Sequence, residues 1–251
     1  MNACNRYLNR ESQKNHIWTL SGRDGELSAI IVHSNQLLLP VLCSQNVPLP
    51  HFLCGFFGTI PIHSLQGRKE DVANLETLLE KIGLLAAESY DYDVMCIDCE
   101  PSGFHSAGPV GLAIRKPEPT DMDALAALHA AYEQEEVMTL ASEFNTAVSR
   151  LNTLRIFSRE QMLVAELGGQ LVGKINTNAA SFARFQIGGV YVHPHYRGLG
   201  IARRMAGEFV AGLVAQGRGI SLFVKKSNTY ARRVYQRLGF EISGDYRISY
   251  Y

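Results

Sequence analysis

The residues of this chain best suited to chemistry lie in a glycine-rich turn, Arg197-Gly198-Leu199-Gly200. An apolar run of β-forming residues, Val190-Tyr191-Val192, precedes the turn and stops at Pro194, and a helical pattern begins at Ile201. Glycines at such a junction let backbone amides converge, and the first turn of a helix adds unpaired amides and the positive end of its dipole. This arrangement binds anions, phosphates above all.

The spacing of the glycines discriminates among three phosphate-binding designs. A nucleotide P-loop requires Lys and then Ser or Thr directly after its last glycine, whereas Ile201 follows Gly200 here. A dinucleotide-binding turn requires a third glycine where Arg203 stands. The pattern that remains is Arg-x-x-Gly-x-Ala, formed by Arg197, Gly200 and Ala202. Taken alone, these residues also suit an ordinary glycine turn before an amphipathic helix.

A second motif follows the helix that begins at Ile201. Residues 221–224 read as a strand, Asn228 precedes a helical pattern, Tyr235 lies seven residues later, and Leu238-Gly239-Phe240 ends the segment. The two motifs, in this order, resemble the pyrophosphate loop and the second signature of the GNAT superfamily of acyl-coenzyme A N-acyltransferases. The resemblance covers residues 109–251, the size of one domain.

The resemblance implies a fold and a set of site residues. The fold class is α/β (α+β): a mixed, mostly antiparallel sheet flanked by helices, in which the strand ending at Val192 and the strand at 221–224 run parallel and splay apart. The thioester of acetyl-coenzyme A would enter that gap, and Tyr235 would act as the general acid toward the leaving thiolate. The cofactor-binding residues implied by the resemblance are Val190, Tyr191, Val192, Arg197, Gly198, Leu199, Gly200, Ile201, Ala202, Arg203 and Asn228.

Structural alternatives stand beside the last two assignments. Asn228 is also the expected N-cap of the last helix. Tyr235 shares a helix face with Val234 and Leu238, which is the pattern of a core tyrosine. His129, on a helical apolar stripe, is expected to be packed in the core.

The general base is the point at which the sequence departs from the family. Many relatives place a Glu on the strand before the loop or on the next strand, whereas Gln186 and Phe223 stand at the matching positions. An alkyl amine is mostly charged at neutral pH, so a base or a desolvating pocket is needed. The candidates are Glu135, Glu136 and His193, which the sequence does not rank.

These features predict an N-acetyltransferase that transfers the acetyl group of acetyl-coenzyme A directly, in a ternary complex, to a primary amine of a small molecule or peptide. The alternative is a non-catalytic acyl-coenzyme A sensor, to which the missing Glu would be suited. The sequence identifies neither the acceptor nor the oligomeric state.

The composition and charge of the chain argue against nucleic acid and membranes as binding partners. The 251 residues are 46% hydrophobic and 19% charged, typical of a globular protein. The formal net charge is zero, with 24 basic and 24 acidic residues, so no global field gathers nucleic acid or an anionic membrane. The basic residues of the second half suit a phosphate-rich cofactor better than a nucleic-acid surface, since no aromatic residues interleave them.

No apolar run has membrane-spanning length and no signal-peptide core begins the chain, so we expect a cytoplasmic protein without a membrane anchor.

We expect two domains, residues 1–105 and 109–251, joined by a Ser-, Gly- and Pro-rich linker. The first would be a smaller α/β domain. Its order of strands, helix and strand suggests a degenerate GNAT-like copy, whose turn at 64–69 lacks a second glycine. Its expected strands are 16–20, 27–32, 37–42, 55–60 and 92–97, with a helix at 69–85. In the second domain we expect strands at 110–115, 161–167, 171–177 and 221–224 and a strand that ends at Val192. We expect helices at 120–135, 146–157, from 201 and after 228.

The cysteines favour no catalytic or metal site. All five lie before residue 100, which removes a covalent cysteine route from the GNAT-like half. Cys96 and Cys99 form a C-x-x-C, but a metal site would require a second pair nearby. We expect a strand-end pair of reduced thiols.

Overall fold

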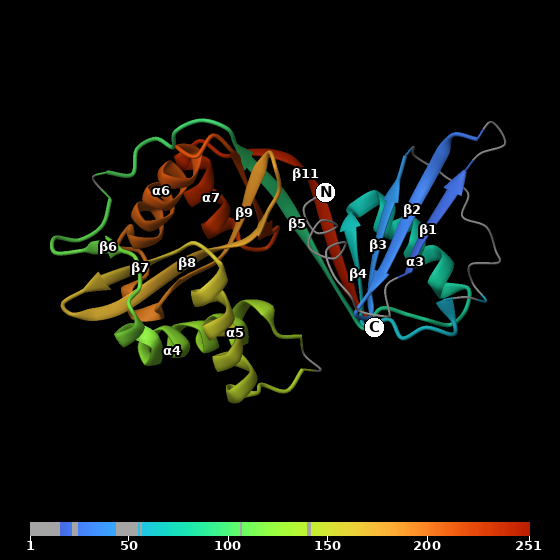
Figure 1. Ribbon diagram of the computed structural model, residues 1–251, viewed down its shortest axis with the longest axis horizontal. Helices are drawn as coiled ribbons and strands as arrows, with labels where there is room; N and C mark the ends of the chain where they lie inside the picture. Colours follow the sequence, from blue (N-terminus) through green and yellow to red (C-terminus); the bar gives the residue numbers. More distant parts are fainter. Residues whose placement is uncertain (1–15, 22–24, 44–54, 56, 106, 140–141) are drawn as a thin grey trace. The chain divides into compact units, whose positions relative to one another are not determined.

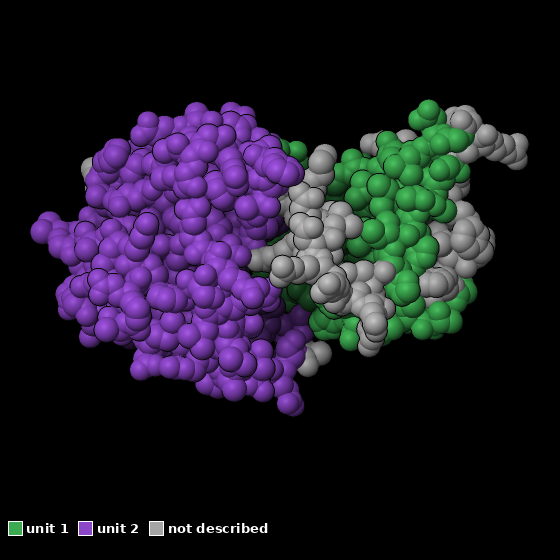
Figure 2. All heavy atoms as spheres, viewed as in Figure 1, with its two compact units in different colours: residues 1–94, 225–227, 243–251 green, residues 95–224, 228–242 purple. Residues whose placement is uncertain are grey.

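The computed structural model describes residues 16–21, 25–43, 55, 57–105, 107–139 and 142–251. The chain divides into two compact units (Figure 2). Unit 1 comprises residues 1–94, 225–227 and 243–251, and unit 2 comprises residues 95–224 and 228–242. Both units draw on separate stretches of chain, and the predicted domain limits, 1–105 and 109–251, stay a prediction.

In the described residues of unit 1, helix α3 packs on a sheet (Figure 1). Its strand order is β1-β2-β3-β4-β11-β5; β1 to β3 form antiparallel pairs, β4 pairs parallel to β3, and β11 pairs antiparallel to β4. The helix buries Val72, Leu75 and Leu79 against Ile31 and Leu65 of the sheet. The elements are β1 (His16–Ser21), β2 (Leu27–Ser34), β3 (Leu37–Leu42), β4 (Ser64–Arg68), α3 (Lys69–Glu80), β5 (Glu88–Ile97) and β11 (Glu241–Tyr250), the last two of which also contribute residues to unit 2.

Two local predictions in this unit are wrong. Residues 55–60 do not form the expected strand, because Gly55 and Phe57 are helical and a turn follows. The Phe57 ring is fully buried and packs edge-on against Trp18 at 6.0 Å, so core packing overrides strand propensity there. The expected turn at 64–69 is instead strand β4. Its Gly67 admits a close neighbouring backbone, since a Cβ would lie 3.2 Å from the Pro40 carbonyl oxygen.

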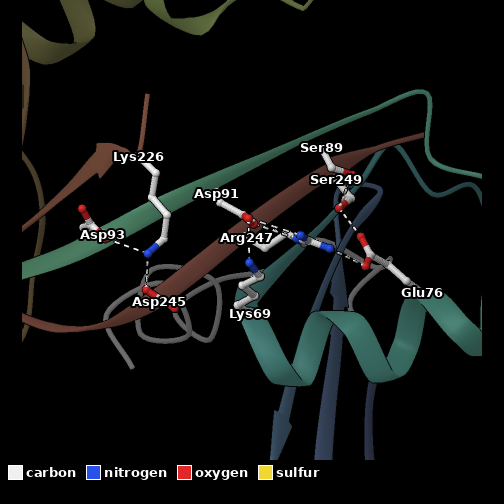
Figure 3. Close-up of polar contacts among 9 residues, drawn as sticks. All are labelled: Lys69, Glu76, Ser89, Asp91, Asp93, Lys226, Asp245, Arg247 and Ser249. Carbon is white, nitrogen blue, oxygen red and sulfur yellow. Dashed lines mark hydrogen bonds and ion pairs between the residues drawn. The ribbon is translucent and has the colours of Figure 1, made fainter. Parts of the chain in front are cut away.

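Charged side chains from β5, β11 and α3 form a network within unit 1 (Figure 3). Arg247 donates to Asp91 at 2.8 Å and to Glu76 at 3.1 Å, and Lys69 donates to Asp91 at 2.8 Å. The hydrogen bonds from Arg247, and then those from Lys69, lower the pKa of Asp91 to about 2 against the opposing effect of burial. These contacts fasten the helix to the two strands.

Unit 2 has the strand order β5-β10-β9-β8-β7-β6. Strands β6 to β9 form antiparallel pairs, and β9 and β10 run parallel. Helices α6 and α7 lie on one face of this sheet and α4 and α5 on the other (Figure 1). The remaining elements are β6 (Ala113–Arg115), η1 (Pro119–Asp121), α4 (Met122–Tyr132), the π-turn η2 (Glu133–Val137), α5 (Thr146–Arg159), β7 (Met162–Leu167), β8 (Gln170–Ala180), β9 (Arg184–Val192), η3 (Pro194–Tyr196), α6 (Ile201–Val214), β10 (Gly219–Lys225) and α7 (Thr229–Leu238).

The predicted fold class is confirmed: a mixed, mostly antiparallel sheet with parallel strands and flanking helices. The first strand of unit 2 begins at Ala113 rather than Val110, because Leu112 N donates to Pro109 O at 3.2 Å in a turn. Over the described ranges, no helix combines the length and apolar character needed to cross a membrane. Cys96 is half-buried and Cys99 is exposed, and neither forms a disulfide with a described residue.

Candidate active site

The centre of the candidate site is a wedge between β9 and β10. The parallel pairing of these strands is limited to residues 184–186 with 219–221, although β9 continues to Val192 and β10 to Lys225. Beyond Gln186 the described partner of β9 is β8, on its other side. The two strands therefore separate, as predicted, and the segment Val190-Tyr191-Val192 forms one side of the opening.

A glycine turn connects the end of β9 to helix α6. Gly198 and Gly200 have φ values of +80° and +83°, a left-handed conformation that glycine adopts without strain. A Cβ on Gly200 would also lie 3.0 Å from the amide nitrogen of Gly108. The first helical bond at this end of α6 is donated by Arg204 N to Gly200 O at 3.0 Å, so the preceding amides are the unpaired donors of a helix start.

The turn fits an anion such as a diphosphate. The first turn of α6 carries no acidic residue to oppose one. Arg203, in that first turn, has a buried Nε without a hydrogen-bond partner among the described residues. A buried guanidinium nitrogen left unpaired beside a helix N-terminus favours a negatively charged ligand.

Arg197 ties this turn to its surroundings through three contacts. Its Nε donates to the Val192 carbonyl at 2.9 Å, and its guanidinium lies 5.3 Å from the centre of the Tyr191 ring. Its Nη2 donates to Glu135 at 2.7 Å. The hydrogen bond from Arg197 lowers the pKa of Glu135, and that from the Tyr191 hydroxyl adds to the effect. Glu135 is therefore held as a carboxylate.

Tyr235 lies in the core cluster of unit 2, with 7% of its surface exposed. Its ring packs edge-on against Phe240, with centroids 5.7 Å apart. Burial raises the pKa of the Tyr235 phenol, and the neighbouring Tyr132 and Glu136 raise it further. The phenol thus keeps its proton at neutral pH, as a general acid must, while the ring also packs as a core residue.

Asn228 is the N-cap of α7, as predicted: its Oδ1 accepts from Ala231 N at 3.0 Å. The sequence reasoning missed a second contact. Asn228 Nδ2 donates to Glu136 Oε1 at 3.4 Å, across 92 positions of sequence. The cofactor contact implied for Asn228 stays a prediction.

A buried lysine beneath α4 was also missed. Lys174, on β8, is 1% exposed; its Nζ donates to the Gly189 carbonyl at 2.9 Å and lies 4.5 Å from the centre of the Tyr132 ring. Burial lowers the pKa of Lys174 to about 7. Burial, and then the charge of Lys174, lower the pKa of the neighbouring His129 to about 4, and that histidine is packed as expected.

The absence of a side chain at Gly189 leaves space for the buried Lys174 amine. Gly189 has φ +58° where the β8–β9 register shifts, and a Cβ on it would lie 2.2 Å from Asn176 Oδ1 and 2.9 Å from Lys174 Nζ. Such a β-bulge redirects a strand and often borders an active site. The signal in the sequence was the glycine pair Gly188-Gly189 within an otherwise β-forming run.

The three candidate bases lie in different settings. Glu135 is engaged by Arg197, and His193 caps η3, its Nδ1 accepting from His195 N at 3.4 Å. Glu136 is half-buried and faces Asn228. Gln186 and Phe223, at the usual base positions, lie on the two strands that flank the wedge.

Comparisons with known proteins agree with this geometry. Residues 125–240 match the model of the acetyltransferase (GNAT) family. A GCN5-related N-acetyltransferase from Sphaerobacter thermophilus is 21% identical with a TM-score of 0.65, over 98% of this chain and 83% of that chain. A GCN5-related N-acetyltransferase from Kribbella flavida is 14% identical with a TM-score of 0.60, over 99% and 93%. A GNAT-family acetyltransferase from Colwellia psychrerythraea is 12% identical with a TM-score of 0.58, over 94% and 85%.

The parallel pair, the glycine turn and the helix that follows it define a GNAT fold. The chain contains a domain of the GNAT acetyltransferase family at residues 125–240. At the family level this implies an acyltransferase, and the family generally uses acetyl-coenzyme A as co-substrate. The family match leaves the first 124 residues uncovered, so a degenerate GNAT-like copy in the leading part stays a prediction.

Proposed function

We propose that the protein is an N-acetyltransferase that transfers the acetyl group of acetyl-coenzyme A to a primary amine of a small molecule or peptide, directly and in a ternary complex. The observation that carries this proposal is the wedge between β9 and β10, because the β9 side of that wedge leads straight into the glycine turn at the start of α6. A thioester with a phosphate-rich tail matches both features.

The binding roles follow from the positions of the residues. The amides of Gly198 to Arg203 and the Arg203 guanidinium would bind the diphosphate, and the backbone edge at Val190-Tyr191-Val192 would hold the pantetheine arm. Asn228 lies at the start of α7, directly after the strand on the other side of the wedge. Acetyl-coenzyme A supplies the activated acyl group as a thioester.

The catalytic roles belong to the wedge and to Tyr235. Backbone amides of the β9 edge near Val192 would stabilise the oxyanion, as fixed dipoles do in other acyl transfers. Tyr235 would protonate the leaving thiolate. Its buried ring holds a hydroxyl whose raised pKa keeps the proton available at neutral pH.

A second candidate function is a non-catalytic acyl-coenzyme A sensor. The observation that favours it is the absence of a carboxylate at Gln186 and Phe223, the wedge positions where relatives often have Glu. A sensor would bind the cofactor through the same turn and wedge and would release no thiol.

Calorimetry and thiol release separate the two candidates. Titration with acetyl-coenzyme A measures binding, and a thiol-reactive dye measures coenzyme A release with spermidine, phenethylamine and a lysine-containing peptide as acceptors. Binding with amine-dependent release supports the enzyme, binding without release on any amine favours the sensor, and no binding contradicts both. Gly200→Ala, at the N-cap of α6, should abolish binding, whereas Gly212→Ala, within α6 and with no atom within 4 Å of the added Cβ, should leave binding intact.

A further inference from the structure

The π-turn η2 places two consecutive glutamates near the wedge. It follows α4 directly and closes with Met138 N donating to Glu133 O at 2.9 Å. Tyr132, the last residue of α4, packs edge-on against Tyr191 of β9 with centroids 6.3 Å apart, which fixes the start of η2 over the β9 side. π-turns occur frequently at functional sites because they redirect side chains locally.

The two glutamates reach opposite sides of the wedge. Glu135 turns toward β9 and the glycine turn, where it accepts from Tyr191 at 3.2 Å and from Arg197 at 2.7 Å. Glu136 turns toward the start of α7, where it accepts from Asn228 at 3.4 Å. Asn228 is separated from the end of β10 by two residues. The turn therefore spans the open end of the wedge, with one carboxylate on each side.

The contacts of the two carboxylates suit different roles. Glu135 is bound to a guanidinium and a phenol, so its affinity for a proton is lowered. Glu136 is half-buried, and its Oε1 accepts from the neutral side-chain amide of Asn228. Its charge also raises the pKa of Tyr132 and of Tyr235, which means that it lies close to both phenols.

We infer that Glu136 is the general base of the acetyl transfer, an assignment that rests on the proposed function. Its carboxylate takes one proton from the ammonium form of the acceptor and passes it to solvent, and the neutral nitrogen then bonds to the acyl carbon. The carbon–sulfur bond breaks, and Tyr235 gives its proton to the sulfur. The bonded nitrogen releases its second proton, which restores the Tyr235 phenol, so an ammonium ion and a thioester give an amide, a thiol and one proton in solvent. This base occupies the end of the wedge and replaces the carboxylate missing at Gln186 and Phe223.

The test is Glu136→Gln with a set of acceptors of graded basicity, and Glu135→Gln is the matched control one residue away. A general base contributes on the order of 10²- to 10⁴-fold. With a strongly basic amine at neutral pH, Glu136→Gln should lower kcat/KM about 100-fold or more, while the affinity for acetyl-coenzyme A, measured by calorimetry, stays within about 3-fold. With weakly basic amines that are already neutral at the assay pH, the loss should be clearly smaller.

Each outcome decides one assignment. Equal losses for weakly and strongly basic amines, or an active Glu136→Gln enzyme, would overturn the role of Glu136 and leave the transferase proposal standing. A greater loss in Glu135→Gln than in Glu136→Gln on strongly basic amines would also overturn it. A wild-type protein that binds acetyl-coenzyme A yet acetylates none of the acceptors would overturn the proposed function, and the Glu136 assignment with it.

Discussion

Replacing Lys174, the buried lysine of unit 2, tests whether burial lowers its pKa and destabilises the fold at neutral pH. Lys174 Nζ is almost fully buried, and burial lowers its pKa from the ordinary 10.5 to about 7. A difference of one in pKa is about 1.4 kcal/mol, so the folded state disfavours the charged amine by about 5 kcal/mol at low pH. Because the unfolded chain binds more protons between pH 7 and 10.5, this cost is about 4 kcal/mol at pH 7, about 2 kcal/mol at pH 9 and about 1 kcal/mol at pH 10.

The variant Lys174→Met removes this cost and one hydrogen bond. The Gly189 carbonyl loses its donor, which destabilises the fold by about 1 to 3 kcal/mol at every pH. Relative to wild type, we therefore expect Lys174→Met to be more stable by about 1 to 3 kcal/mol at pH 7 and less stable at pH 10. The charge of Glu133 and the imidazole of His129 face the same amine, and His129, whose pKa is lowered to about 4, stays neutral between pH 7 and 10.

The measurement is urea unfolding between pH 7 and 10. The single tryptophan, Trp18, belongs to unit 1, so unit 2 should be followed by far-UV circular dichroism and by hydrogen exchange of peptides from β8. Lys116→Met, at an exposed position of unit 2, is the control and should follow wild type at every pH. A constant difference between Lys174→Met and wild type across this range would refute a neutral buried amine.

Three further predictions concern acid stability, the glycine turn and the proposed acid. Asp91→Asn should destabilise unit 1 by about 2 kcal/mol at pH 7; because the pKa of Asp91 is lowered from 3.8 to about 2, acid titrations of the two proteins should converge between about pH 4 and pH 2, and parallel titrations would contradict the ion pair. Gly200→Ala should cost about 1 to 2 kcal/mol of stability from its positive φ, measured by thermal unfolding; unchanged stability would argue against the left-handed turn. Tyr235→Phe keeps the packing on Phe240 and should lower kcat about 100-fold without changing acetyl-coenzyme A affinity; an unchanged rate would remove Tyr235 from the mechanism.

The parts of the site that could be predicted from the sequence are those set by neighbouring residues. A glycine turn between a strand and a helix, with Gly198 and Gly200 in left-handed conformations, depends on a few consecutive positions. The cap formed by Asn228 joins it to an amide three residues later. The prediction of a strand at 55–60 was wrong for the opposite reason, because burial of Phe57 against Trp18, which is distant in the sequence, decides the local conformation.

The contacts that rank the bases join distant positions, which is why the sequence left them unranked. Glu135 and Glu136 are adjacent and chemically identical, and only their partners distinguish them. Glu135 contacts Arg197, which lies 62 positions away in the sequence, and Glu136 contacts Asn228, which lies 92 positions away. Periodicity places both residues at the end of a helix but does not show which side of a wedge each will reach.

The buried lysine links these observations. Burial of the Lys174 amine, which is partly neutral in the fold, costs about 4 kcal/mol at pH 7. Lys174 donates to the carbonyl of Gly189, and the Tyr132 hydroxyl interacts with the backbone of the same residue, so the bulge of β9 is fixed by two side chains just before Val190. Tyr132 is also the residue from which η2 departs toward the wedge. Lys174 and Tyr132 thus fix the strand edge that would hold the thioester and the start of the turn that carries Glu136. The loss of stability from burying Lys174 is offset by this positioning of the two elements.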